Sequence, residues 1–144
     1  VPFIVTNHVY DQIGSMYPQK VMGGGSAVQY AASSIVFLSK RKEKEGTDLV
    51  GNIIKCEAKK SRLSKEGSKV ATRLYFDERG LDKYYGLIEL GEKYGVFTRV
   101  GNRIRIGESN VYPKSILGDP EKYFTDEVMA KLEEAARTEF SYGN

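Results

Sequence analysis

Apolar runs and alternating apolar and polar positions predict strands in the first part of the chain. Residues 1–6 form a nearly continuous apolar run, which is typical of a strand buried on both faces of a sheet. Residues 34–38 form a second run of this kind. After a charged loop at 40–48, residues 49–60 are expected to return beside it as an antiparallel partner. Regular alternation over residues 70–76 predicts a further strand with one covered face.

A helical spacing replaces the strand pattern after the turn sequence Asp77-Glu-Arg-Gly80. Apolar residues recur at helical intervals over 81–94, and Gly95 stands where a glycine commonly ends a helix. A small hairpin is expected around the turn pair Gly101-Asn102. A short helical turn is expected at 111–117. The second part of the chain is therefore predicted to combine helices with a hairpin.

A last helix is predicted to begin at Asp119-Pro120-Glu121, with Asp119 as its cap and proline in its first position. Its apolar stripe consists of Phe124, Val128, Leu132, Ala135 and Ala136. Together these patterns predict two units, a β-rich unit over residues 1–80 and a small α+β module over residues 81–144.

A long segment without a clear period separates the first two predicted strands. Residues 9–22 contain glycine, proline and mixed polar residues, and this composition predicts a loop. A structureless loop of this length is usually either functional or disordered. Gly23, Gly24 and Gly25 then precede a short helix, for which Ser26 is the expected cap.

Composition indicates a folded chain and excludes several classes of site. Hydrophobic residues make up 40% of the 144 residues and aromatic residues 11%, enough for a core of one domain or slightly more. No apolar run approaches the ~20 residues that span a bilayer. The single cysteine, Cys56, excludes an intramolecular disulfide, and one cysteine with one histidine cannot form the usual zinc site. Because Val1 stands inside a predicted strand, we expect the chain to be part of a longer protein.

Charge is unevenly distributed along the chain. Residues 1–72 hold 11 basic and 6 acidic side chains, whereas residues 73–144 hold 11 basic and 13 acidic ones. A basic first half is compatible with a polyanionic partner, although ordinary solubility charge is the simpler explanation.

The sequence lacks the usual elements of a nucleotide site. It contains no G-x-x-x-x-G-K-[ST] phosphate loop, and no acidic residue follows an apolar strand in the manner of a Walker B strand. The chain alone is therefore not expected to cradle a nucleotide.

Several short sequences, taken in order, resemble a known family. They are Asn7-His8 after the first apolar run, Gly23-Gly-Gly25 before a helix, Lys60-Ser61-Arg62 at a strand end, the run from Asp82 to Gly95, and Gly118-Asp119-Pro120-Glu121. This order resembles the C-terminal half of the recombinase core in the RecA family, most nearly its phage, UvsX-like branch. The resemblance implies an α/β fold: the C-terminal half of a RecA-like ATPase core sheet, lacking the phosphate-loop half, followed by a small α+β C-terminal domain.

The resemblance also implies roles for particular residues. His8 would sense the γ-phosphate of ATP, and the second DNA-binding loop would lie at about 9–25, with Ile13 as a wedge between bases. Lys60 and Arg62 would act in trans on the ATP of a neighbouring subunit. The residues implied in DNA contact are Ile13, Gly14, Met16, Tyr17, Lys20, Gly24 and Gly25, and the one implied in the subunit interface is Tyr30.

Explanations of the same residues that involve no specific function remain open. A lone histidine at a strand end is most often a surface residue, the 9–22 segment can be a flexible connection, and a basic cluster is commonly a solvated run. Asp11 departs from the more basic loop of the bacterial family members. By geometry alone, residues two apart in an extended chain point the same way, which fits the shared role that the resemblance implies for Lys60 and Arg62.

The resemblance implies an ATP-dependent DNA recombinase that forms filaments on single-stranded DNA and promotes homologous pairing and strand exchange. ATP and Mg²⁺ would bind mainly to an upstream half, so the chain alone is predicted to be catalytically inactive. Expected partners are single-stranded DNA, double-stranded DNA during exchange, further copies of the protein, and phage mediator and single-strand-binding proteins, in the cytoplasm of a bacterial host. The alternatives are a non-catalytic RecA-like module that binds DNA or a partner, and a replicative helicase core of the same superfamily, against which the C-terminal module argues.

Overall fold

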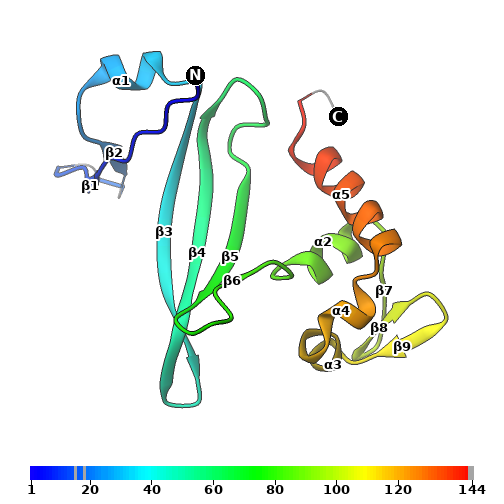
Figure 1. Ribbon diagram of the computed structural model, residues 1–144. Helices are drawn as coiled ribbons and strands as arrows, with labels where there is room; N and C mark the ends of the chain where they lie inside the picture. The colour runs from blue at the N-terminus through cyan, green and yellow to red at the C-terminus, as the bar shows by residue number, and fades with distance from the viewer. Residues whose placement is uncertain (15, 18, 143–144) are drawn as a thin grey trace.

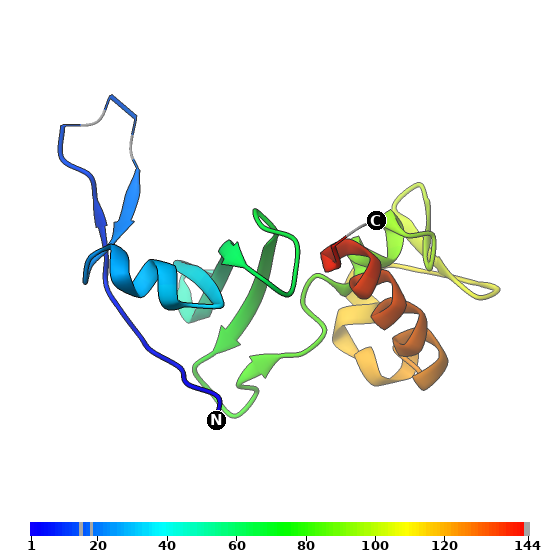
Figure 2. The same cartoon turned by 90° about the horizontal axis from the view of Figure 1, so that it is seen from above.

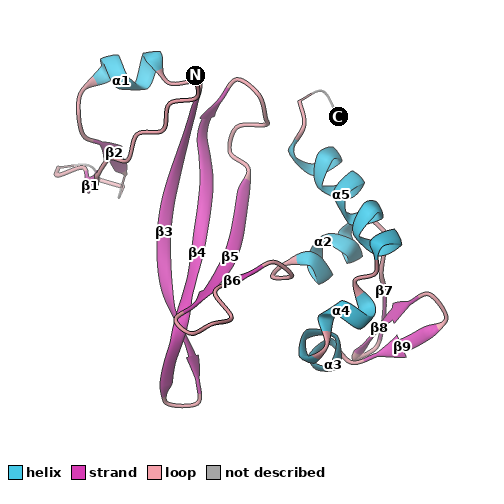
Figure 3. Ribbon diagram, in the orientation of Figure 1, coloured by secondary structure: helices cyan, strands magenta, loops and turns pink. Residues whose placement is uncertain are grey.

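Within the residues that the structure describes, helices combine with three antiparallel sheets (Figures 1 and 3). The computed structural model describes residues 1–14, 16–17 and 19–142. Ser15 and Pro18, inside the predicted loop at 9–22, lie outside the described residues. No helix in the described ranges is long and apolar enough to cross a membrane.

The largest sheet has the strand order β3-β4-β5-β6. Its strands are β3 (Ser34–Glu45), β4 (Asp48–Ser61), β5 (Lys69–Tyr75) and β6 (Leu81–Asp82). The antiparallel pairing of β3 with β4 and the strand predicted at 70–76 are both confirmed. Little of this sheet is covered by other parts of the described chain, since Val36, Leu38 and Val70 are 52%, 65% and 47% exposed.

The charged loop predicted at 40–48 is wrong, because β3 and β4 continue through it to a tight turn at Gly46 and Thr47 (Figure 1). Arg73 of β5 binds Glu43 at 3.3 Å, and Arg79 binds Glu45 at 3.3 Å. The far end of this hairpin is thus a paired ladder with a register shift at Glu43/Lys44, and residues 40–48 within it include no apolar side chain. A prediction that relies on hydrophobic alternation therefore misses it.

The first apolar run is not a strand. Residues 1–6 belong to no strand within the described chain, and Phe3 and Ile4 are 88% and 90% exposed. A strand buried on both faces needs neighbours on either side, and no described strand lies along this run. The prediction of a buried strand at 1–6 is therefore wrong for this structure.

The second part of the chain holds almost all of the hydrophobic core. It contains α2 (Leu87–Lys93), a sheet of β7 (Thr98–Val100), β8 (Arg103–Ile106) and β9 (Ser109–Val111), and the helices α3 (Pro113–Gly118), α4 (Pro120–Tyr123) and α5 (Asp126–Phe140). The predicted hairpin and short helix are confirmed, whereas β9 was not expected. The core consists of Ile88, Phe97, Ile104, Ile116, Phe124 and Leu132.

The helix expected over 81–94 begins only at Leu87, and the residues before it have other contacts. Leu81 and Asp82 pair with β5 as strand β6, and Arg73 binds the Asp82 carboxylate at 2.7 Å. The Arg73 guanidinium also lies over the rings of Tyr75 and Tyr85. The predicted end of the helix is confirmed, because Gly95 has a φ of +74°, a conformation that favours glycine.

The last helix is divided where one helix was predicted. The α4 turn ends at Phe124, whose side chain is buried in the core, and α5 begins after Thr125. The Thr125 hydroxyl accepts a 3.5 Å hydrogen bond from the Val128 amide, while Asp119 makes no side-chain cap. Asp119 was therefore wrongly predicted as the cap of the long helix, and burial of Phe124 explains the break.

The carboxylate of Glu139 ties the end of α5 to the end of α2. It accepts hydrogen bonds from Lys93 and Tyr94, and the bond from Lys93 is the main reason that the pKa of Glu139 lies below its ordinary value. A carboxyl whose pKa falls on folding stabilises the fold above its unfolded pKa and loses this effect as pH drops through the folded pKa.

Glu139→Gln should consequently lower the thermal midpoint at neutral pH, and the difference from the unaltered protein should shrink below the ordinary glutamate pKa. Calorimetry across this pH range measures the effect. Glu108→Gln, at an exposed turn position without an ion pair among the described residues, serves as the control. A difference that stays constant with pH would contradict this role of Glu139.

Candidate nucleic-acid interface

The segment predicted as a loop is a hairpin closed at its base. Strands β1 (Val9–Asp11) and β2 (Lys20–Met22) pair, with Val9 opposite Met22. Below them, the Asn7 side chain donates to the Gly23 carbonyl at 2.7 Å, and the Gly23 amide donates to the His8 carbonyl at 3.1 Å. The prediction of a loop without regular structure is thus wrong at both ends. We call residues 9–22 the loop hairpin.

The tip of the loop hairpin presents apolar side chains to solvent. Ile13 is 100% exposed, Met16 94% and Tyr17 75%. The Gln12 amide donates to the Gln19 carbonyl at 2.8 Å, which holds the two sides together below the tip. In both views the hairpin lies away from the C-terminal helices (Figures 1 and 2). Exposed apolar groups gathered at one projecting point commonly mark an interaction site.

The base of the hairpin is built from glycines whose backbone conformations disfavour other residues. Gly24 and Gly25 have φ values of +88° and +78°. A Cβ at Gly23 would lie 3.0 Å from the Tyr10 ring, whereas a Cβ at Gly25 would meet nothing within 4 Å. Gly25 precedes helix α1 (Ser26–Ala31) as its N-cap residue, so the expected capping by Ser26 is wrong. Backbone is therefore accessible beside Gly25.

The side chains of Lys60 and Arg62 converge on the end of α1. Lys60 donates to the carbonyls of Gln29 and Tyr30 at 2.7 and 3.1 Å, and Arg62 donates to the Tyr30 carbonyl at 3.4 Å. Carbonyls at a helix end lack partners within the helix and carry partial negative charge, which attracts cations. The shared target agrees with the expectation from their spacing that the two side chains point the same way. Tyr30 itself is 76% exposed, so its ring is not part of this chain's core.

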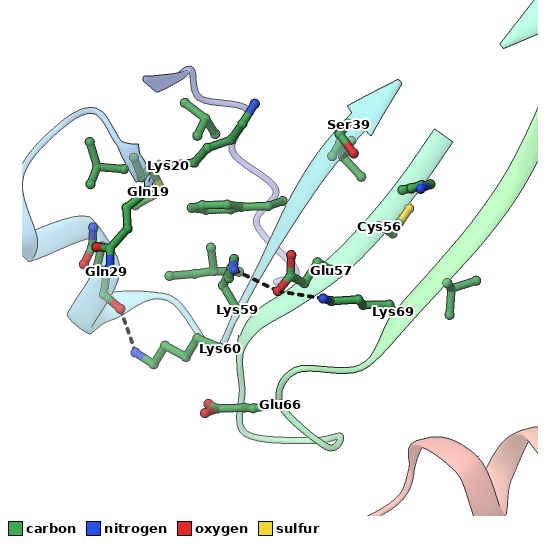
Figure 4. Close-up of a pocket in the computed structure, with 18 of the residues that line it drawn as sticks. Gln19, Lys20, Gln29, Ser39, Cys56, Glu57, Lys59, Lys60, Glu66 and Lys69 are labelled. Carbon is green, nitrogen blue, oxygen red and sulfur yellow. Dashed lines mark hydrogen bonds and ion pairs between the residues drawn. The ribbon is translucent and has the colours of Figure 1, made fainter. Parts of the chain in front are cut away.

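A hollow of about 1210 Å³ lies between β2, α1 and the main sheet (Figure 4). Five lysines line it against two glutamates, and apolar side chains such as Phe37 and Val70 form part of its wall. Glu57 pairs with Lys59 at 2.8 Å, and the hydrogen bond from Lys59 lowers the pKa of Glu57. The basic residues that line the hollow are Lys20, Lys55, Lys59, Lys60 and Lys69.

The structure therefore brings some of the predicted site residues together and leaves others apart. Lys20, Tyr30 and Lys60 line one hollow. His8 lies exposed at the base of the loop hairpin, beside Gly23. Four residues stand apart at the tip of the hairpin: Ile13, Gly14, Met16 and Tyr17.

Sequence reasoning missed two kinds of contact at this site. The amide of Asn7 closes the base of the loop hairpin, and a polar residue directly after an apolar run was the only signal for it. Lys55 and Lys69 add charge to the hollow from neighbouring strands. Alternation along β4 and β5 contains this information, but only the register of the two strands reveals it.

The sequence of this chain is similar to those of several known proteins. Over 102 residues it is 35% identical to the Recombination and repair protein of Enterobacteria phage T4, covering 71% of this chain and 26% of that protein. It is 29% identical to Protein RecA of Thermotoga neapolitana over 69% of this chain and 28% of that protein. With Protein RecA of Porphyromonas gingivalis the identity is 23%, over 96% of this chain and 42% of that protein. The chain belongs to the RecA family.

No protein-family model matches the chain. This RecA-family chain spans about a quarter of the length of the T4 and Thermotoga relatives. The resemblance to the phage branch is confirmed by the T4 match, and mixed α/β structure agrees with it.

Proposed function

We propose that this chain is the part of an ATP-dependent recombinase that holds single-stranded DNA and reports on nucleotide. The intact protein forms filaments on DNA and promotes homologous pairing and strand exchange in recombination and repair. The observation that carries the proposal is the link from an exposed apolar hairpin tip, through α1, to the basic pair Lys60 and Arg62. The T4 relative bears the name of a recombination and repair protein, which supports the same assignment.

DNA is held by the loop hairpin through apolar side chains and backbone more than through charge. Ile13 and Met16, both fully presented to solvent, insert at base steps of an extended strand, and Tyr17 stacks beside them. Gly24 and Gly25 allow the backbone to approach phosphates. Lys20 supplies the one positive charge among the described hairpin residues, opposite Asp11 in the pairing.

Nucleotide is sensed from two sides in this proposal. His8 lies at the base of the loop hairpin and contacts the γ-phosphate of its own subunit's ATP, while Lys60 and Arg62 reach the ATP of a neighbour. The exposed Tyr30 packs against that neighbouring subunit. ATP and Mg²⁺ are bound mainly by residues outside this chain, and the chain alone hydrolyses no ATP. Duplex DNA, phage mediator proteins and single-strand-binding proteins join the filament in the host cytoplasm.

Replacing Ile13 and Met16 together with alanine should weaken binding of a labelled oligodeoxythymidylate by about tenfold, or about 1.4 kcal/mol in total, because apolar side chains inserted at base steps contribute less than the ~1–3 kcal/mol of an aromatic stack on each base. Fluorescence anisotropy at low salt measures the affinity of the unaltered chain and the variant. Leu117→Ala, which alters an exposed apolar residue (46%) far from the hairpin in sequence, is the control. Equal affinities, or the same loss in the control, would refute the loop hairpin as the DNA contact.

A second candidate is a RecA-like binding module without catalysis. The absence of a phosphate loop from the sequence favours it. The two candidates separate when the nucleotide-binding half of the T4 relative is supplied, either fused or in trans. Restored DNA-dependent ATP hydrolysis supports the recombinase, whereas DNA binding without hydrolysis supports the module.

A further inference from the structure

Ser61, the residue between the two cations, ends β4 and is held by several hydrogen bonds. It is 6% exposed, and its hydroxyl accepts hydrogen bonds from the Leu63 and Ser64 amides at 3.2 and 2.9 Å. Its amide donates to Glu66 at 3.0 Å. In extended backbone the side chain of Ser61 points opposite to those of its two neighbours. Fixing Ser61 on one side therefore aims Lys60 and Arg62 toward α1 on the other.

The remaining polar atom of Ser61 is held from the far end of the chain. The Tyr142 hydroxyl donates to the Ser61 carbonyl at 2.6 Å, although the two residues are 81 positions apart. A second bond runs beside it, from the Lys65 amide to the Phe140 carbonyl at 2.9 Å. The end of α5 and the residues just after it thus form hydrogen bonds with residues 61–65, beside the basic pair.

Contacts continue from this point to the loop hairpin. Lys60 and Arg62 bind the end of α1, and the Arg62 amide donates to the Ser33 carbonyl at 3.0 Å. Helix α1 begins directly after the glycines at the base of the loop hairpin. The end of the C-terminal helix and the candidate DNA contact are therefore joined by hydrogen bonds, the backbone from Lys60 to Arg62, and one short helix.

We propose that Tyr142 is a positioning residue for Lys60 and Arg62, and that the C-terminal helix sets the reach of this basic pair through the Ser61 carbonyl. The inference rests on the proposed function and adds a control point to it. When the Tyr142 hydroxyl is absent, the Ser61 carbonyl loses this hydrogen bond. The side chains of Lys60 and Arg62 then no longer point toward one target.

Tyr142→Phe tests this with the removal of one oxygen atom. In the 144-residue chain, exchange of the Lys60 ammonium protons with water, followed by nitrogen NMR, should become about fivefold faster, as expected for the loss of one ordinary hydrogen bond. Tyr112→Phe is the matched control, since Tyr112 is 50% exposed against 55% for Tyr142 and accepts a bond from Arg103. It should leave the Lys60 signal unchanged.

The functional arm uses a full-length protein that carries this sequence. There Tyr142→Phe should lower kcat for DNA-dependent ATP hydrolysis about fivefold while the KM for ATP changes by less than about twofold. An unchanged Lys60 signal overturns the proposal, and so does a changed signal with unchanged kcat. If Lys60→Ala lowers kcat and Tyr142→Phe does not, the positioning role alone fails. If Lys60→Ala also leaves kcat unchanged, the proposed function fails and this inference with it.

Discussion

Alanine at both Lys60 and Arg62 should lower DNA-dependent ATP hydrolysis by about a thousandfold in a full-length protein that carries this sequence, the lower end of the effect of an arginine finger. The two side chains converge on one carbonyl group, so they can equally converge on one anion. A transferring phosphoryl group gains negative charge on its oxygens, and two cations stabilise that charge. A steady-state ATPase assay at saturating single-stranded DNA measures the effect.

Two comparisons make this result specific. Lys40→Ala with Lys42→Ala removes two lysines at the same spacing from an exposed strand, and neither has an ion pair among the described residues. This control should change kcat by less than about twofold. Mixing the Lys60/Arg62 variant with a variant whose own nucleotide pocket is disabled should recover part of the activity, since each supplies what the other lacks across an interface. Full activity of the double variant alone, or no recovery on mixing, would disprove action in trans.

The family resemblance singled out the basic pair, and local spacing predicted only that its two side chains point the same way. Lys60 and Arg62 stand two apart at the end of a strand, and in the structure both reach the end of α1. The glycines before α1 were also evident, because runs of glycine favour backbone that other residues avoid. The sequence pattern did not predict which groups the two side chains bind. Their acceptors are the backbone carbonyls of Gln29 and Tyr30, and every residue has a backbone carbonyl, so no residue type marks these two.

Long-range contacts mark the limit of prediction for this site. The bond from Tyr142 to Ser61 joins residues 81 positions apart, and a tyrosine near the end of a helix predicts nothing about its target. The closed base of the loop hairpin depends on Asn7 reaching Gly23, which requires the chain to fold back first.

Strand prediction failed in two opposite ways, and both follow from what covers each strand. Residues 1–6 are apolar yet pair with no strand in the part of the chain that the structure describes, whereas the run at 40–48 is charged yet belongs to the β3–β4 ladder. A run of apolar residues indicates that a segment is buried. Buried segments are usually, but not always, paired as strands in a sheet. The ladder instead has its glutamates bound by arginines from β5 and the following turn.

Ile104→Ala should lower the free energy of unfolding by about 2–5 kcal/mol, the usual cost of removing a buried branched side chain. Ile104 is 0% exposed in β8 and lies in the core cluster with Phe97 and Leu132. Denaturant unfolding gives the midpoint and slope for the unaltered chain and the variant. Leu63→Ala, at a residue that is 83% exposed, should stay within about 0.5 kcal/mol of the unaltered chain.

The same substitution reaches the candidate site because the core holds α5, and the end of α5 holds the loop of Ser61. Amide exchange at Ser64, whose proton is bonded to the Ser61 hydroxyl, should therefore accelerate in Ile104→Ala along with the amides of the core itself. Ile106→Ala, at a partly buried position two residues along the strand, should produce a smaller change of the same kind. If the core amides exchange faster while the exchange rate of the Ser64 amide stays unchanged, the hydrogen bonds between the end of α5 and the segment at 61–65 do not depend on this core.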